Sequence, residues 1–362
     1  MDPRGKGLTD DALQLPAPPG GRALRGPLLV GPGHRRSRRR ARPALRRRLQ
    51  RSPGPGHRCR RGKALSAQDI PGAQLDEWLA DAAAIARAAG ALLRERYELG
   101  QATGDVRAAH KGHAHNLVTQ TDLDSEALIV ARLKAAFPGH GLLAEEGGAA
   151  GSTAATTPRW LIDPLDGTNN FAHGIGVFAV NLALTVGDEV LLGATFDPLR
   201  DEIFTSRRGG GAWLNGRRLA VSPRRSLEEA VVATGFPYDK QANPDNNLTQ
   251  FAAVMPLVRG IRRMGSAALD MAYVAAGRFD AYWERGIQAW DVAPGILLVR
   301  EAGGTVTDDQ GRPMRPDAGR IVASNGRLHN TLMARLAEAR PAMAPFGESP
   351  ASAPPASQAP LP

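Results

Sequence analysis

Cysteine is nearly absent from this chain of 362 residues, because Cys59 is the only one. A single cysteine excludes a disulfide framework and fits a reducing compartment, so we expect a cytoplasmic protein. The sequence has no run of about 18 or more apolar residues, which predicts no transmembrane helix and no membrane partner. The first 20 residues also lack the continuous apolar segment of a secretory signal.

Two common catalytic signatures are missing as well. The sequence contains no G-x-x-x-x-G-K-[ST] loop for phosphate binding, and the glycine triplet at 209–211 is better explained as a hairpin turn. It contains no G-x-S-x-G nucleophile elbow, and Cys59 lies outside the region predicted to fold. The chemistry to look for is therefore one that needs no protein nucleophile.

Positive charge is concentrated at the start of the chain. The formal net charge is +10, but residues 1–72 hold 18 Lys and Arg against 4 Asp and Glu. The remaining residues hold 28 basic and 32 acidic side chains. A mildly acidic body is thus joined to a strongly basic arm, and the net charge says nothing about the partners of the body.

The basic arm, residues 1–72, is rich in Arg, Pro and Gly and has no apolar periodicity. Such a segment cannot bury enough surface to offset its ordering entropy, so it is predicted to be disordered. It could be a nucleic-acid-binding arm, an Arg-rich targeting segment, or a translated stretch upstream of the true start. The arm has no Phe, Tyr or Trp, so we favour a non-functional extension over nucleic-acid binding.

The rest of the chain predicts a mixed α and β body. We expect an N-terminal half over 73–215 with a metal site, a C-terminal half over 216–340, and a disordered Pro/Ala/Ser-rich tail over 341–362. Apolar periodicity predicts helices near 75–93, after Asp122, and over 267–276 and 292–302. Strands are predicted at 141–144, 160–162, 177–186, 190–196, 201–205, 261–264 and 279–283.

The most informative stretch is W-L-I-D-P-L-D-G-T-N-N-F at 160–171. An apolar strand delivers Asp163, and Pro164 interrupts normal strand pairing. Asp166 follows across a turn, Gly167 allows a sharp bend, and Thr168 starts a short helix whose N–H groups can receive a phosphate. Two carboxylates this close repel each other unless a cation sits between them, and oxygen ligands favour Mg²⁺. A surface turn is the alternative.

Three more acidic positions occur in similar settings. Glu145 and Glu146 end an apolar run, Asp122 stands at a helix start, and Asp291 precedes a helix with Pro294 in its first turn. Asp122 and Asp291 could each simply cap a helix. Their occurrence together around the 163–168 motif strengthens the prediction of a metal site.

At these residues the chain resembles the inositol monophosphatase family, a group of magnesium-dependent, lithium-sensitive phosphatases. The resemblance covers about residues 75–335 and is carried by the motif at 160–171 and by W-D-V-A-P-G-I-L-L-V-R-E-A-G-G at 290–304. It implies an α+β fold, a layered αβαβα sandwich of the inositol monophosphatase and fructose-1,6-bisphosphatase type, and commonly a homodimer. It also implies a phosphoric monoester hydrolase with two or three Mg²⁺ ions.

The resemblance also implies roles for individual residues. Metal ligands would be Glu145, Asp163, Asp166, Asp291 and the carbonyl oxygen of Leu165. Asp122 and Thr168 would orient and deprotonate the attacking water, with Glu145 as a further catalytic residue, and the N–H groups of Gly167 and Thr168 would hold the phosphate. Ala267, Glu284 and Lys111 would contact or approach the substrate.

The substrate implied is a small phosphorylated polyol, with myo-inositol 1-phosphate the leading candidate because Glu284 can accept hydrogen bonds from ring hydroxyls. Fructose 1,6-bisphosphate, histidinol phosphate and adenosine 3′,5′-bisphosphate remain alternatives, since the metal cage is common to all. Some relatives bind RNA or the transcription machinery, which is an alternative of another class. Arg285 could alter the charge at the pocket mouth, and Arg262 and Arg263 could attract a second phosphate or line a dimer surface.

Overall fold

The computed structural model describes residues 67–104, 108–111, 113–152 and 154–339. The described residues belong to one compact unit. The prediction for the tail lies outside the described ranges, and so does the prediction for residues 1–66 of the basic arm. The predicted disorder of residues 67–72 is wrong, because Ala67–Asp69 form a 3₁₀-helix, a long helix begins at Gly72, and Ala67 and Ile70 are buried in the core. The division into two halves stays a prediction. Within the described ranges, no helix combines the length and the apolar character needed to cross a membrane.

The largest layer is an eight-stranded sheet in the order β10-β9-β8-β7-β6-β5-β3-β4. All its neighbouring strands are antiparallel except β3 and β5, which run parallel. Its strands are β3 (Gly141–Ala144), β4 (Gly148–Ala150), β5 (Arg159–Asp166), β6 (Ala179–Val186), β7 (Glu189–Asp197), β8 (Glu202–Arg207), β9 (Gly211–Leu214) and β10 (Arg217–Arg218).

A five-stranded sheet forms the second β layer, in the order β12-β11-β13-β15-β14. Its first three strands are parallel and β15 is antiparallel to both of its neighbours. Its strands are β11 (Val231–Thr234), β12 (Gly260–Arg262), β13 (Ala281–Arg285), β14 (Thr305–Thr307) and β15 (Arg320–Ser324). A separate hairpin joins β1 (Ala108–Lys111) to β2 (His113–Thr119).

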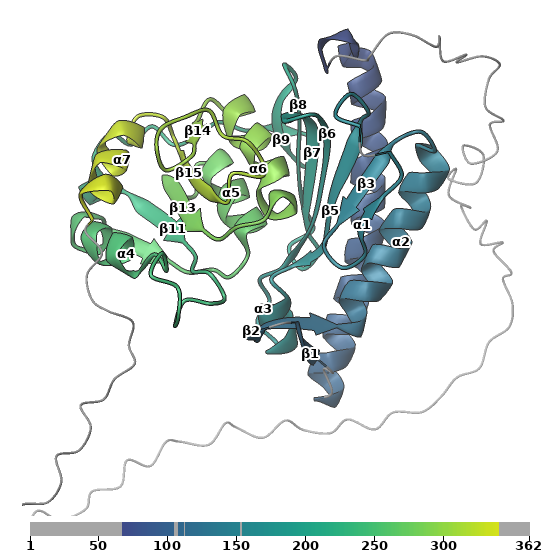
Figure 1. Ribbon diagram of the computed structural model, residues 1–362, viewed down its shortest axis with the longest axis horizontal. Helices are drawn as coiled ribbons and strands as arrows, with labels where there is room; N and C mark the ends of the chain where they lie inside the picture. The colour runs from purple at the N-terminus through teal and green to yellow at the C-terminus, as the bar shows by residue number, and fades with distance from the viewer. Residues whose placement is uncertain (1–66, 105–107, 112, 153, 340–362) are drawn as a thin grey trace, which may run out of the picture. The chain divides into compact units, whose positions relative to one another are not determined.

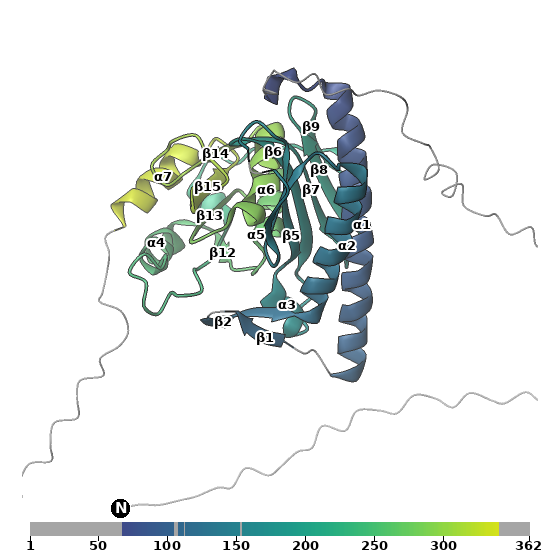
Figure 2. The same ribbon diagram turned by 45° about the vertical axis from the view of Figure 1, so that its right-hand side comes forward.

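Helices fill the three remaining layers, as Figures 1 and 2 show. Helices α1 and α2 lie together against one face of the large sheet, α5 and α6 lie between the two sheets, and α4 and α7 cover the far side of the second sheet. The predicted layered αβαβα sandwich is therefore confirmed. The helices are α1 (Gly72–Thr103), α2 (Gln120–Ala136), α3 (Thr168–Ala172), α4 (Leu248–Val254), α5 (Ala267–Ala275), α6 (Ala289–Glu301) and α7 (His329–Glu338).

The strands at the centre of the large sheet are buried on both faces. Every residue of β6 is buried, and so is every residue of β7 after Glu189. Helices cover both sides, so these strands appear in the sequence as nearly continuous apolar runs without alternation. This explains why 177–186 and 190–196 were recognisable as strands.

The glycine triplet at 209–211 leads from β8 into the antiparallel strand β9, so the predicted hairpin turn is confirmed. Two other details of the sequence prediction change in the structure. Helix α6 begins at Ala289, so Pro294 lies beyond its first turn and inside the helix. Asp291 likewise lies in the first turn of α6 instead of preceding the helix.

At Gly193 on β7, helix α6 lies close against the large sheet. A Cβ atom there would lie 2.7 Å from Pro294 Cα and 2.9 Å from Pro294 Cβ. We therefore expect Gly193→Ala to lower the free energy of unfolding by about 1–3 kcal/mol, because a packed helix must shift. Urea denaturation measures it.

The matched control is Gly139→Ala, where nothing lies within 4 Å of the added atom. That variant should stay within about 0.5 kcal/mol of the wild type. Equal stability of the two variants would show that the sheet and α6 are not packed as closely as described.

Candidate active site

The acidic residues gather where parallel strands β3 and β5 end. Glu145 directly follows β3, and its N–H donates to the Ile162 carbonyl oxygen on β5 at 3.1 Å. Asp163 comes one residue later on β5. Because the carboxyl ends of parallel strands meet at the same edge of a sheet, Glu145 and Asp163 are brought together there.

Pro164 disrupts the strand pairing as predicted. The register of β5 against β6 shifts between Asp163 and Asp166. The Leu165 N–H donates to Asp163 Oδ1 at 3.0 Å, and the Ser125 hydroxyl on α2 donates to the Pro164 carbonyl oxygen at 2.9 Å. The bulge is thus held from both sides, and it turns Asp163 and Asp166 toward the same cavity.

Gly167 makes the sharp bend that starts α3. Its φ is +98°, a conformation that favours glycine, and a Cβ atom there would lie 2.9 Å from the Val177 carbonyl oxygen. The Asn170 amide donates to the carbonyl oxygens of Val177 and Met264, each at 2.8 Å. The predicted short helix after Gly167 is confirmed, and it is anchored to both halves of the chain.

Asp122 both caps α2 and contacts Thr168. Its Oδ2 accepts from the Thr119 N–H at 2.8 Å and from the Thr119 hydroxyl at 2.5 Å. Its Oδ1 accepts from the Thr168 hydroxyl at 2.8 Å. The capping alternative and the pairing with Thr168 are therefore true together, one on each carboxylate oxygen.

Asp166 and Asp291 are held at the starts of two other helices. Asp166 Oδ2 accepts from the Ser266 hydroxyl at 2.5 Å and from the Ala268 N–H at 2.8 Å, at the start of α5. Asp291 Oδ2 accepts from the Gln288 N–H at 2.9 Å, at the start of α6. The first turns of α3, α5 and α6 thus converge on one place, where the positive ends of the helix dipoles favour negative charge.

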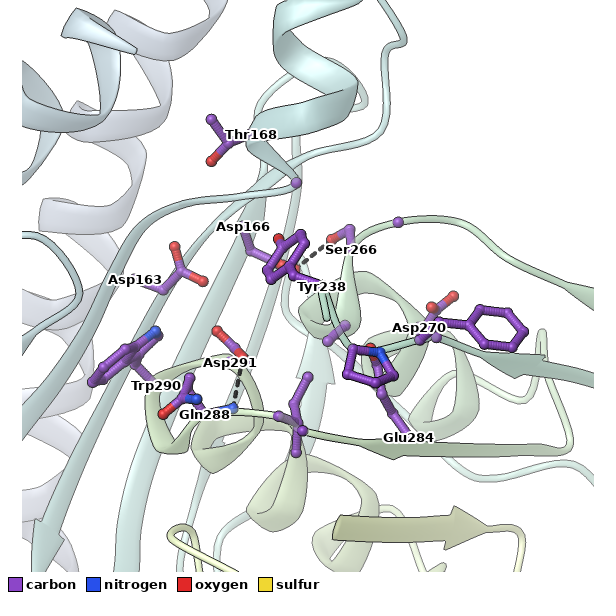
Figure 3. Close-up of a pocket in the computed structure, with 18 of the residues that line it drawn as sticks. Asp163, Asp166, Thr168, Tyr238, Ser266, Asp270, Glu284, Gln288, Trp290 and Asp291 are labelled. Atoms are coloured by element: carbon purple, nitrogen blue, oxygen red, sulfur yellow. Dashed lines mark hydrogen bonds between the residues drawn. The ribbon is translucent and has the colours of Figure 1, made fainter. Parts of the chain in front are cut away.

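These residues line a cavity of about 320 Å³ (Figure 3). Asp163, Asp166 and Asp291 lie at one end of it, near Thr168, whereas Asp270 and Glu284 lie at the other end. Every residue assigned a role from the sequence lines this cavity, apart from Asp122 and Lys111. The assigned lining residues are Glu145, Asp163, Leu165, Asp166, Gly167, Thr168, Ala267, Glu284 and Asp291.

Burial and mutual repulsion raise the pKa values of the carboxyl groups at this end of the cavity. Burial, followed by the carboxylates of Glu145, Asp166 and Asp291, raises the pKa of Asp163 well above its ordinary value. Burial, followed by Asp166 and Glu145, also raises the pKa of Asp291. Burial raises the pKa of Asp166 to about 6, although its hydrogen bonds from Ser266 and α5 favour the charged form. Like charges held this way are stabilised by a bound cation.

The donor set fits a divalent cation that prefers oxygen. The acids Glu145, Asp163, Asp166 and Asp291 supply carboxylates, with no thiol among the cavity-lining residues, as Mg²⁺ prefers. Among the described residues, no three His, Cys, Asp or Glu side chains are already close enough to form a ligand group. The raised pKa values of Asp163, Asp166 and Asp291 indicate a place for positive charge among these carboxylates.

Several lining residues were not found from the sequence. Thr234 ends β11, and Gly235, Phe236, Pro237 and Tyr238 follow it into the cavity wall. Strand β11 runs parallel to β12 and β13, so the segments after all three strands meet at the same edge. The usable signal was a short run, 231–234, that is followed directly by Gly-Phe-Pro.

Asp270 is a second lining residue that sequence reasoning missed. It is buried on α5, and burial followed by the charge of Glu284 raises its pKa well above the ordinary value. Burial also raises the pKa of Glu284 to about 7, and the Tyr282 hydroxyl donates a hydrogen bond to Glu284. The far end of the cavity therefore holds two further carboxyl groups that can exchange hydrogen bonds with a polar ligand.

The arginines singled out from the sequence differ in whether they line the cavity. Arg263 lines the cavity. The suggestion that Arg285 alters the charge at the pocket mouth is wrong, because its guanidinium forms ion pairs with Asp245 and Asp309. Lys111 belongs to β1, but its side chain is outside the described part of the chain, and so are those of the neighbouring histidines.

Comparisons with known proteins agree with this geometry. Residues 74–342 match the model of the inositol monophosphatase family. A protein from Pseudomonas aeruginosa named Nus factor SuhB is 46% identical over 254 residues, which are 69% of this chain and 92% of that protein. An inositol-1-monophosphatase from Mesorhizobium japonicum is 46% identical over 216 residues, 60% of this chain and 81% of that protein.

A solved structure is similar over the same region. The inositol monophosphatase from Anabaena superposes with a TM-score of 0.66 at 40% sequence identity. The match covers 74% of this chain and 98% of the Anabaena chain.

The raised pKa values predict how stability depends on pH without divalent cations. The carboxyl groups of Asp163, Asp166, Asp291 and Glu284 have higher pKa values in the folded than in the unfolded chain, so folding favours their protonated form. In EDTA, stability should therefore fall as pH rises above about 4, the unfolded value, and through the folded pKa values of Asp166, about 6, and Glu284, about 7. Asp163→Asn keeps the acceptor for the Leu165 N–H and removes one charge, so it should be more stable than wild type at pH 7.5.

Urea denaturation at pH 4.5 and pH 7.5 in EDTA checks this. Asp317→Asn is the control, because its side chain is 64% exposed, and it should change stability by less than about 0.5 kcal/mol. An Asp163→Asn protein less stable than wild type at pH 7.5 would show that the cavity carboxylates do not repel one another.

Proposed function

Since the chain belongs to the inositol monophosphatase family, we propose that it hydrolyses the phosphate monoester of a small polyol, with myo-inositol 1-phosphate as the substrate and Mg²⁺ as the cofactor. Family membership supports a phosphatase, and the proposal adds its substrate and metal. The observation that carries it is the division of one cavity into an end lined by Asp163, Asp166 and Asp291 and an end lined by Asp270 and Glu284.

The residues proposed to hold two or three Mg²⁺ ions are Glu145, Asp163, Asp166, Asp291 and the carbonyl oxygen of Leu165. When bound, Mg²⁺ neutralises phosphate charge and lowers the pKa of a bound water. The N–H groups of Gly167 and Thr168 would hold the phosphate, since the first N–H groups of a helix have no partner within the helix.

Thr168 and Asp122 are proposed to take the proton from the attacking water. The Thr168 hydroxyl has one hydrogen and lies 2.8 Å from Asp122 Oδ1, so its lone pairs can accept from a water in the cavity. Asp122 is fully buried, and burial raises its pKa, which makes it a better proton acceptor than an exposed aspartate. No covalent intermediate with the protein is needed.

Ring recognition is proposed for the far end of the cavity. Glu284 can accept hydrogen bonds from neighbouring ring hydroxyls, and Ala267 is another lining residue. A role for Lys111 near the substrate is proposed from the family resemblance alone. The carboxyl groups of Glu284 and Asp270 would repel a second phosphate, which disfavours bisphosphate substrates. Arg263 is the nearby positive charge that could offset this. A homodimer is proposed from the family resemblance alone, and a cytoplasmic location from the single cysteine.

A second candidate function follows from the relative named Nus factor SuhB, at 46% identity. It would be binding of RNA or of the transcription machinery, with or without catalysis. The arginines of the basic arm would contribute phosphate contacts, and binding would weaken steeply with salt. The cavity carboxylates have no part in this function.

Phosphate release by the full chain tests the proposal. Inositol 1-phosphate, fructose 1,6-bisphosphate, histidinol phosphate and adenosine 3′,5′-bisphosphate are each supplied with and without Mg²⁺. We expect Mg²⁺-dependent release with a preference for inositol 1-phosphate and no release by Asp163→Asn. Preference for another ester would leave the Mg²⁺-dependent phosphatase in place and change the assigned substrate. Release from none of the esters would favour the second function.

Glu284→Gln tests ring recognition. We expect KM for inositol 1-phosphate to rise about tenfold, because a buried carboxylate that accepts hydroxyl hydrogen bonds becomes a weaker and partly mismatched acceptor. KM for an aryl phosphate without hydroxyls is the control and should change less than about twofold. Equal effects on both esters would show that Glu284 does not contact the ring.

A further inference from the structure

Asn181 is a fully buried polar residue in the middle of β6. It is paired directly with Asp163 on β5 and with Thr195 on β7. Cross-strand partners point to the same face of a sheet, so these three side chains form one row. Its side chain reaches α6, which places this row on the face that α6 covers.

The row meets α6 at a defect in the helix. In an α-helix the carbonyl oxygen of residue 290 accepts from the N–H of residue 294. That residue is Pro294, which has no N–H, so the Trp290 carbonyl oxygen loses its usual partner. A buried acceptor left in this state destabilises the folded chain.

The Asn181 amide replaces the missing donor. Its Nδ2 donates to the Trp290 carbonyl oxygen at 2.8 Å and to the Asp291 carbonyl oxygen at 2.9 Å. Its Oδ1 accepts from the Thr195 hydroxyl at 2.6 Å. The two carbonyl oxygens can only accept, so the NH₂ group must face them, and this fixes the orientation of the amide. Both hydrogens of the NH₂ group are thus used on the first turn of α6.

The Asn181 side chain therefore affects the positions of two carboxylates. Asn181 is the strand neighbour of Asp163 and holds the backbone of Asp291, so the separation of Asp163 and Asp291 depends on it. Hydrogen-bonding partners behind metal ligands commonly set metal affinity in this way.

We propose that Asn181 is a positioning residue that sets Asp291 relative to Asp163, and that Pro294 makes the site depend on it. This rests on the proposed function, in which both aspartates bind Mg²⁺. The site depends on Asn181 only while residue 294 is a proline. With an alanine at position 294, the backbone N–H can donate to the Trp290 carbonyl oxygen and so partly replace the Asn181 amide.

A double-mutant cycle on the full chain tests the proposal, using Asn181→Ala, Pro294→Ala and the two combined. Mg²⁺ affinity is measured by titration calorimetry, and stability by urea denaturation in EDTA. We expect Asn181→Ala to weaken Mg²⁺ binding about 10-fold to 100-fold in the wild-type background. In the Pro294→Ala background the same change should cost less than about threefold, because the helix bond is restored.

Asn325→Ala is the matched control. Asn325 is also buried, and it donates to the Ser222 hydroxyl oxygen and the Arg224 carbonyl oxygen, away from the cavity. This variant should lower the denaturation midpoint and leave Mg²⁺ affinity unchanged. Thr195→Val serves if Asn181→Ala does not fold, and it should weaken Mg²⁺ binding by a smaller factor in the same direction.

The outcomes separate the two proposals. Equal loss of Mg²⁺ affinity in both backgrounds, or unchanged affinity in Asn181→Ala and Thr195→Val, would overturn the positioning role while the wild type still binds Mg²⁺ and releases phosphate. A wild type that does neither would contradict the proposed function. In that case the urea data still decide whether Asn181 and Pro294 are coupled, and additive effects on stability would overturn the link.

Discussion

Repulsion among buried carboxylates is the constraint on which the rest of this structure depends. Glu145, Asp163, Asp166 and Asp291 line one cavity, and burial with mutual charge raises the pKa of Asp163 and Asp291 well above the ordinary value. Such a group disperses unless the scaffold holds it. Each aspartate accepts at least one backbone N–H, from Leu165, Ala268 or Gln288, and these bonds oppose the dispersal.

The layered fold provides that scaffold. Two sheets present the ends of parallel strands to the same space, β3 and β5 from one and β11, β12 and β13 from the other. Helices α5 and α6 lie between the sheets, and their first turns carry Ser266 and Asp291 to the cavity. Small residues such as Gly193 allow α6 to lie close to the large sheet, so the helix start cannot drift.

Helix capping and site construction use the same atoms. Asp122 caps α2 with one oxygen and holds Thr168 with the other, and Asp291 accepts from the N–H that precedes its helix while lining the cavity. Asn181 performs the matching task at the Pro294 defect. Fold stability and site geometry are therefore coupled, since a change that loosens a helix start also moves a carboxylate.

Beyond the layered sandwich, which was implied by the family resemblance, the sequence by itself predicted a mixed α and β body, the central strands of the large sheet, most of the helices, and the acidic residues at one end of the cavity. It could do so because buried strands leave apolar runs, and because D-P-L-D-G-T at 163–168 joins a bulge, a turn and a helix start within six residues. Only the tertiary structure showed that Tyr238 and Asp270 line the cavity and that Asn181 contacts α6. It also showed that Arg285 forms an ion pair with Asp245 and does not line the cavity. Their roles depend on strand pairing and helix packing between segments far apart in the chain, such as Asn181 with Trp290, and such distances are not written in local sequence patterns.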